Sequence, residues 1–263
     1  MAKKAGIPLT SYVLMILLVC FSFFAGYFFF KSKNLEQKLT TGTQQGQAQP
    51  QAPQAVTVTL DQIKKLFNTD HIIFGDVKRK VLFVEISDPS CPYCHIAGGQ
   101  NPELSETAGN FKYVSEGGAY TPPLPEIKKL VDEKKASYVF LYGNGHGNGR
   151  LASEALYCAY EKGKFWEVHD QLMTNTGYSL INDEVQNNRD QAQKLVDFVS
   201  AQIDPNFLTE CLTSAKHEKK LERDEQIDAT LGFAGTPHFF VNETAVNGAQ
   251  DWNAFKELVD KLL

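Results

Sequence analysis

A strand pattern that leads directly into a pair of cysteines constrains this chain more than any other feature. Residues 81–86 are rich in β-branched and aromatic side chains, which is typical of a strand buried in a sheet. The sequence Cys91-Pro92-Tyr93-Cys94 follows after a short turn, and the proline after Cys91 is typical of the first position of a helix. We therefore expect both cysteines at the point where a strand passes into a helix.

This position predicts different properties for the two thiols. The free N–H groups and the positive dipole end of a helix N-terminus stabilise a thiolate, so an exposed Cys91 with a lowered pKa is expected. Cys94, one turn into the helix, should be shielded. Thiol–disulfide exchange requires such a difference. One sulfur attacks or is attacked, and the second sulfur resolves the mixed disulfide that forms.

Half of a zinc site is the alternative interpretation of these two cysteines. It would require a second pair of sulfur or imidazole ligands, and His95 alone leaves the shell one ligand short. The remaining cysteines, Cys20, Cys158 and Cys211, are isolated from one another in the sequence. The pattern favours redox chemistry, with no metal and no cofactor other than the redox-active disulfide.

The composition sets broad limits on the chain. Its 263 residues, 43% of them hydrophobic, suffice for one core of ordinary domain size. The formal net charge is −5, and we find no lysine- or arginine-rich run interleaved with aromatic residues. Nucleic acid is therefore not an expected partner.

The N-terminal region predicts a membrane anchor within residues 1–30. Residues 12–30 contain no charge, and their length is sufficient for a helix that spans a bilayer. A cleaved signal peptide would be shorter and followed by small residues, whereas this run leads into Lys31 and Lys33. We expect a single-pass cell-membrane protein with its N-terminus inside and its catalytic domain outside the cytoplasm, where disulfides persist.

Residues 31–55 are polar and rich in Gln, Gly, Ala and Pro, so they predict a flexible linker. Residues 56–263 form the expected domain. It starts with a helix at 60–67 and continues through the strand at 81–86, a surface segment at 98–123 with a short extended piece at 111–114, a helix at 124–134 and a strand at 138–142. A helical block at about 150–230 then precedes a strand at 239–241, a possible partner strand at 244–246 and a last helix from Trp252.

Three further features of the domain bear on its function. The glycine-rich stretch 143–149 lacks the Lys-Ser/Thr ending of a phosphate-binding loop, so it predicts a flexible connection. His169 is interpreted as a packed histidine at the edge of the core. Cys158 and Cys211 fall in two different predicted helices, where a structural disulfide and two separately buried thiols both remain possible.

The order of these motifs resembles that of the DsbA-like thiol:disulfide oxidoreductases of the thioredoxin superfamily. The likeness extends over residues 60–263 and is carried by 83–94, by 163–170 and by Gly235-Thr236-Pro237 before a strand. It implies an α/β thioredoxin-like fold with an inserted helical subdomain, here preceded by a transmembrane helix.

The resemblance also implies residue roles. Cys91 would be the nucleophile, Cys94 the buried partner and Pro237 a cis-proline facing the disulfide. Pro92, Tyr93 and the backbone of Thr236 would contact the substrate. Glu85 would be a buried acid that shuttles the proton of Cys94, although a strand glutamate facing solvent is the alternative.

The implied activity is the introduction of disulfides into exported cysteine-containing proteins, with re-oxidation by a quinone-linked membrane partner. Two other functions remain open from the sequence. The same fold could act as a tethered reductase or isomerase, because Pro92 and Tyr93 do not settle the redox direction. A non-catalytic peptide-binding module, with Cys91–Cys94 as a structural clip, belongs to a different class.

Overall fold

The computed structural model describes residues 57–263. The predicted anchor at 12–30, the linker at 31–55 and Cys20 lie outside the described residues. None of the helices in the described part of the chain combines the length and the apolar composition that a bilayer span requires.

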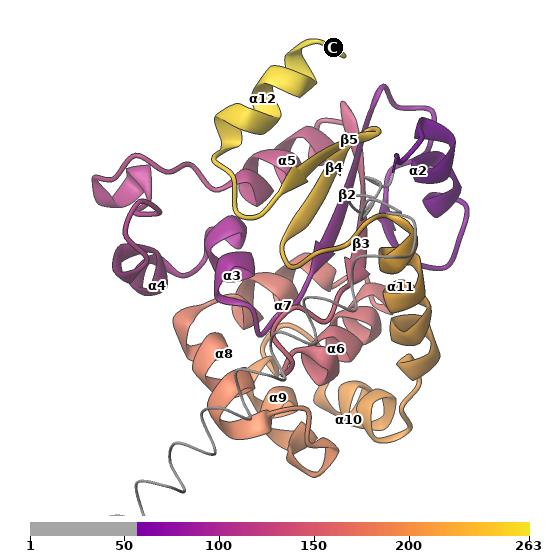
Figure 1. Ribbon diagram of the computed structural model, residues 1–263. Helices are drawn as coiled ribbons and strands as arrows, with labels where there is room; N and C mark the ends of the chain where they lie inside the picture. The colour runs from indigo at the N-terminus through magenta and orange to yellow at the C-terminus, as the bar shows by residue number, and fades with distance from the viewer. Residues whose placement is uncertain (1–56) are drawn as a thin grey trace, which may run out of the picture. The chain divides into compact units, whose positions relative to one another are not determined.

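A five-stranded mixed sheet forms the centre of the domain, in the order β1-β3-β2-β4-β5 (Figure 1). The central strand β2 (Val81–Ser87) pairs in parallel with β3 (Ala136–Tyr142) and antiparallel with β4 (His238–Val241). The edge strands β1 (Ile72–Phe74) and β5 (Thr244–Asn247) pair antiparallel with β3 and β4. Every residue of β2 and β3 is buried, as expected for central strands covered on both faces.

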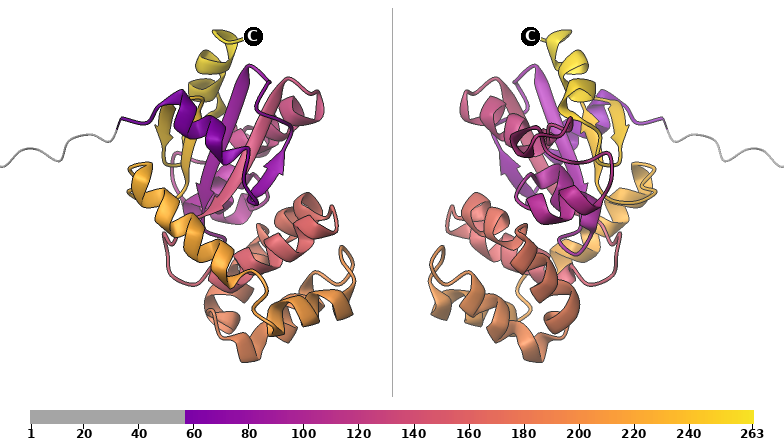
Figure 2. Two further views of the ribbon diagram at one scale, coloured as in Figure 1. Left: turned by 90° about the vertical axis from the view of Figure 1, so that its right-hand side faces the viewer. Right: turned by 90° about the vertical axis from the view of Figure 1, so that its left-hand side faces the viewer.

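Alternating side chains of the sheet contribute to two cores. Phe83, Tyr138 and Phe140 point into the larger core, and Leu82 and Val84 point into the smaller one. The larger core also receives α3 (Pro92–Gly98), α5 (Pro123–Asp132) and α12 (Trp252–Asp260), and the smaller one receives α2 (Leu60–Leu66). Figure 2 shows α2 lying across its face of the sheet. Helices on both faces confirm the predicted α/β thioredoxin-like architecture.

Between β3 and β4 the chain forms the predicted helical insertion. Its elements are α6 (Arg150–Glu161), α7 (Phe165–Leu172), α8 (Asn175–Ser179), η2 (Leu180–Val185), η3 (Arg189–Gln191), α9 (Ala192–Phe198), α10 (Pro205–Thr213) and α11 (Glu218–Thr230). The sequence pattern did not predict α8, η2 and η3, because these elements are short and lack a sustained apolar period. Most of these helices form a block next to the end of the sheet at which α3 begins. The last of them, α11, runs back alongside the sheet (Figures 1 and 2).

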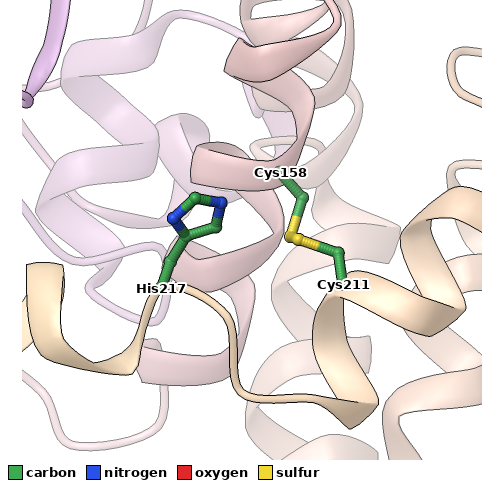
Figure 3. Close-up of side chains that lie close together, drawn as sticks. All are labelled: Cys158, Cys211 and His217. Atoms are coloured by element: carbon green, nitrogen blue, oxygen red, sulfur yellow. A yellow bond between two sulfur atoms is a disulfide. The ribbon is translucent and has the colours of Figure 1, made fainter.

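A disulfide links two helices of the insertion. Cys158 on α6 is bonded to Cys211 on α10, with a Cα–Cα distance of 6.2 Å, and both residues are buried. Figure 3 shows the bridge with His217, which directly precedes α11, beside it. Of the two possibilities that the sequence left open, the structure therefore contains the bridge.

The segment 98–123 differs from the expected surface insertion. It contains the helix α4 (Pro102–Thr107) and the short η1 (Val114–Glu116), and no strand forms over 111–114. Tyr113 and Tyr120 are buried in the larger core, 3% and 4% exposed, and Tyr113 donates a hydrogen bond to the carbonyl of Ile96 on α3. These tyrosines give the segment a packed inner side, which its Gly, Asn, Ser and Pro content obscured.

Removal of the Cys158–Cys211 bridge should destabilise the domain. The bridge joins residues 53 positions apart, and the loss of such a constraint on the unfolded chain is expected to lower the free energy of unfolding by about 2–4 kcal/mol. The test is urea unfolding of the Cys158→Ala/Cys211→Ala variant, followed by circular dichroism.

A matched control replaces Cys91 and Cys94 by alanine, with unfolding measured without reductant so that the Cys158–Cys211 bridge stays intact. These two cysteines are also buried but are free in the structure, so the control removes two buried sulfurs without breaking the bridge between α6 and α10. Equal effects of the two double substitutions would contradict a stabilising role of the bridge.

Candidate active site

Cys91 is placed by the junction between the central strand and α3. The strand β2 ends at Ser87, a tight turn follows, and Cys91 is the N-cap of α3 with Pro92 in the first turn. Proline suits this position because the first N–H groups of a helix have no partner within it. Tyr93, the next residue, is 48% exposed. The predicted strand-to-helix placement of the two cysteines is therefore found in the structure.

The expectation that Cys91 is exposed is wrong. Its side chain is only 5% exposed, and it packs with Cys94 and Met173. The Cys91 thiol donates a hydrogen bond of 3.4 Å to the carbonyl of Thr236, which belongs to the loop before β4. The Thr236–Pro237 peptide bond is cis, and Pro237 is buried. This loop covers the sulfur, an effect that the local sequence around Cys91 could not reveal.

The two sulfurs differ strongly in acidity. The pKa of Cys91 is lowered to about 6, mainly by a hydrogen bond from the Cys94 thiol. Hydrogen bonds from Thr236 and from the backbone N–H groups of Tyr93 and Cys94 contribute less. Burial raises the pKa of Cys94 well above its usual value, and its hydrogen bond to Cys91 adds to this effect. Around neutral pH the reduced pair therefore consists of a Cys91 thiolate and a Cys94 thiol.

Glu85 lies on β2 with its carboxyl group inside the domain. It is 1% exposed, so the alternative of a solvent-facing glutamate is wrong. The Tyr138 hydroxyl on β3 donates a hydrogen bond of 2.5 Å to Glu85 Oε2. Burial raises the pKa of Glu85, and the hydrogen bond from Tyr138 opposes this shift only in part. Glu85 is therefore a buried carboxyl group whose proton is held more tightly than in water.

Asp88 is a site residue that the sequence analysis missed. Its buried carboxylate accepts hydrogen bonds from the Ser90 hydroxyl at 2.6 Å and from the backbone N–H groups of Gly145 and His146 at 3.0 and 2.8 Å. A Cβ at Gly149 would collide with the Asp88 carboxylate. The glycines of 143–149 thus allow the backbone to approach Asp88 closely, which is one established reason for glycine in a loop.

No complete metal shell surrounds the Cys91–Cys94 pair in the described part of the chain. The two ring nitrogens of His95 lie 2.9 Å from the carbonyl oxygen of Met173 and 2.8 Å from that of Pro89, so they point to backbone groups. Burial lowers the pKa of His95 to about 4. A neutral, fully buried His95 holds the turn between β2 and α3 in place.

One other cluster has the residue types of a metal site. The ligand atoms of Cys158, Cys211 and His217 lie within 4.8 Å of one another (Figure 3). Cysteine binds metal ions as the thiolate, and here the two sulfurs are bonded to each other. These three residues could hold a metal ion only after the disulfide is reduced.

The acidity of Cys91 is directly testable. In the reduced protein, thiolate absorbance at 240 nm should appear with a midpoint near pH 6, because Cys91 ionises there while Cys94 stays protonated. In Cys94→Ala the midpoint should move to higher pH, because the hydrogen bond from Cys94 is the largest cause of the lowered pKa.

The Cys91→Ala variant is the matched control and should show no titration near pH 6. A wild-type midpoint above pH 8 would contradict the acidity assigned to Cys91.

Comparisons with known proteins place this geometry in a family. The family model described as thioredoxin matches residues 124–261, more than half of the chain, which includes the cis-proline loop but not the cysteine pair. The chain is 22% identical over 199 residues to disulfide bond formation protein D of Bacillus subtilis, covering 73% of this chain and 76% of that protein. The structure of alpha-DsbA1 from Wolbachia pipientis superimposes with a TM-score of 0.54 at 19% identity, covering 73% of this chain and 90% of that one.

A curated relative of a different kind is the Na(+)/H(+) antiporter NhaA 3 of Salinispora tropica. It is 26% identical over 193 residues, and the match covers 72% of this chain. The chain spans about a quarter of the length of that relative.

The family match agrees with two features of the structure, the cysteine pair between a strand and a helix and the helical insertion. The chain therefore belongs to the thioredoxin family, with the fold of its DsbA-like thiol:disulfide oxidoreductases.

Proposed function

We propose that this protein donates the Cys91–Cys94 disulfide to exported cysteine-containing proteins. The observation that carries the proposal is the difference in acidity between the two sulfurs in one buried pair. The name of the Bacillus subtilis relative, disulfide bond formation protein D, supports the same activity.

The proposed reaction is two successive exchanges. A client thiolate attacks Cys91 Sγ, the Cys91–Cys94 bond breaks, and the Cys94 sulfur leaves with the electron pair and takes up a proton. A second client thiolate then attacks the client sulfur of the mixed disulfide, and Cys91 leaves as a thiolate. The client loses two electrons and the enzyme pair gains two, with no other oxidant in the step.

The acidity of Cys91 favours the oxidase direction. A thiol with a lowered pKa stabilises the reduced form of the pair, because the reduced form contains the thiolate. The disulfide is then a stronger oxidant, and the low-pKa sulfur is also the better leaving group in the second exchange. A reductase would need the opposite balance, with a disulfide that is more stable than its dithiol.

The surroundings of Cys91 provide the proposed client contacts. Pro92 and the exposed Tyr93 lie next to Cys91, and the Tyr93 ring packs edge-to-face on Phe111 with centroids 5.7 Å apart. The Thr236 backbone also contacts the sulfur, with its carbonyl oxygen 3.4 Å from Cys91 Sγ. We propose that an extended client segment binds between these groups and pairs with the Thr236 backbone.

The cellular arrangement is also part of the proposal. Residues 12–30 would anchor the protein in the membrane, and the linker would let the domain reach clients outside the cytoplasm. A quinone-linked membrane protein would re-oxidise the Cys91–Cys94 dithiol. A tethered reductase or isomerase is the second candidate, and redox potential distinguishes the two.

The decisive measurement is the reduction potential of the Cys91–Cys94 pair in the purified full chain. The protein is equilibrated with glutathione buffers, alkylated, and analysed by mass spectrometry of the peptide that contains both cysteines, which separates them from Cys20. We expect a value closer to the ~−120 mV of strong oxidants than to the ~−270 mV of thioredoxin, because of the Cys91 acidity.

A potential near the thioredoxin value would contradict the oxidase and favour the reductase. The Cys91→Ser variant tests the non-catalytic module, since it should lose all ability to oxidise a reduced two-cysteine peptide. Full oxidation by this variant would contradict an enzymatic role for the pair.

A further inference from the structure

The Cys158–Cys211 bridge has a buried neighbour whose nitrogens the fold does not fully use. His217 directly precedes α11 and is 2% exposed. Neither of its ring nitrogens makes a hydrogen bond of good geometry within residues 57–263, although Nε2 lies 3.1 Å from Glu161 Oε1. Buried polar groups are costly without such bonds, so the position of this imidazole needs another explanation.

The three side chains lie as close together as the ligands of one metal ion. The ligand atoms of Cys158, Cys211 and His217 are within 4.8 Å of one another. Figure 3 shows the His217 ring beside the bridge, with one ring nitrogen on the side that faces it. In a tetrahedral zinc site with Zn–S bonds of about 2.3 Å, two sulfurs are roughly 3.8 Å apart. The two cysteine Cα atoms are 6.2 Å apart, so rotation of the side chains alone can separate the sulfurs by that distance.

The donor set determines which ion fits. Two thiolates and one imidazole suit Zn²⁺, whereas Mg²⁺ and Ca²⁺ prefer oxygen ligands. Three protein ligands leave one position of a tetrahedral shell open. Glu161 is three residues after Cys158 on α6, so both side chains lie on one side of that helix. Its carboxylate, already 3.1 Å from the imidazole and 31% exposed, is the neighbouring group that can fill the position directly or through a water.

We propose that the chain with reduced Cys158 and Cys211 binds one Zn²⁺ ion through these two sulfurs and His217. A newly made chain carries both cysteines as thiols, so the site needs no reductant. The ion replaces the two thiol protons, which pass to solvent. This site is separate from the Cys91–Cys94 pair, and the inference does not depend on the proposed function.

The ion and the bridge exclude each other, because both need the same two sulfurs. When a disulfide oxidises the zinc-bound thiolates, the two sulfurs give it two electrons and the Cys158–Cys211 bond forms. The sulfurs of the oxidant leave as thiolates, and the ion leaves as Zn²⁺ with its charge unchanged. Before that step the ion would join α6, α10 and the start of α11, and its binding would add to the stability of the helical insertion.

The test uses the full chain with Cys91→Ala and Cys94→Ala, so that the other cysteine pair cannot bind metal. This parent protein is reduced by a phosphine in denaturant, refolded without oxygen and freed of reductant. Titration with Co²⁺ should give the visible absorption of a tetrahedral thiolate site at one ion per chain, and one equivalent of Zn²⁺ should abolish it. Oxidised glutathione should then release the zinc to a chelating dye as the bridge forms.

Variants in the same background assign the ligands. His217→Ala should bind zinc about 100-fold more weakly, because the loss of a ligand costs at least as much as the loss of an outer partner. Cys158→Ala/Cys211→Ala should show no tetrahedral cobalt spectrum. The matched control is His71→Gln, which alters another buried histidine, paired with Asp224 at 2.9 Å, and should bind as the parent does.

A refolded parent with native circular dichroism and no tetrahedral cobalt site would overturn the proposal. Unchanged zinc affinity in His217→Ala, or equal binding by the parent with its bridge intact, would also overturn it. If the reduced parent refolds only with metal, refolding itself becomes the measurement. Recovery of helical circular dichroism should then require both zinc and His217, and recovery with zinc in His217→Ala would contradict the site.

Discussion

The Asp88 carboxylate, buried at the end of the central strand, accepts backbone N–H groups from a loop 57 and 58 residues later in the chain. A buried carboxylate is stable only when such donors surround it, so the turn before α3 and the 143–149 loop have to form together. The Asp88 backbone N–H also lies 3.4 Å from Cys94 Sγ. One residue thus fixes the turn that places Cys91 at the helix N-terminus and contacts the second sulfur directly.

The fixed geometry explains how two neighbouring cysteines acquire opposite acidities. Cys91 stands at the N-cap of α3, where the N–H groups and the Cys94 thiol stabilise its thiolate. Cys94 is one turn deeper, where burial disfavours charge. The same burial raises the pKa of Glu85 on β2. Position in the fold, and not residue type, thus decides which of the two thiols ionises first.

Much of this arrangement was predictable from local patterns. The run 81–86, the proline after Cys91 and the glycine before Thr236-Pro237 each indicate their own structure, so the central strand, the helix start and the last strands were predicted close to their observed bounds. Asp88 was not found, because one aspartate in a Ser-Asp-Pro-Ser turn resembles an ordinary turn residue. The glycines of 143–149 were the available signal, since glycine often marks a close approach of backbone to another group. The cover over Cys91 depends on Thr236, 145 residues away, which no local pattern contains.

The 143–149 loop connects Asp88 to the loop around Thr236 that covers Cys91. A Cβ at Gly145 would collide with the Thr236 hydroxyl, so the loop that Asp88 holds is also packed on the cis-proline loop. The Thr236 hydroxyl helps to lower the pKa of Cys91, while its carbonyl accepts the thiol proton. In the Cys91–Cys94 disulfide, Cys91 carries no proton to donate, so that carbonyl would be free to accept an N–H from another chain. The oxidised form that a client would attack in the proposed reaction therefore also offers the backbone group with which a client strand would pair.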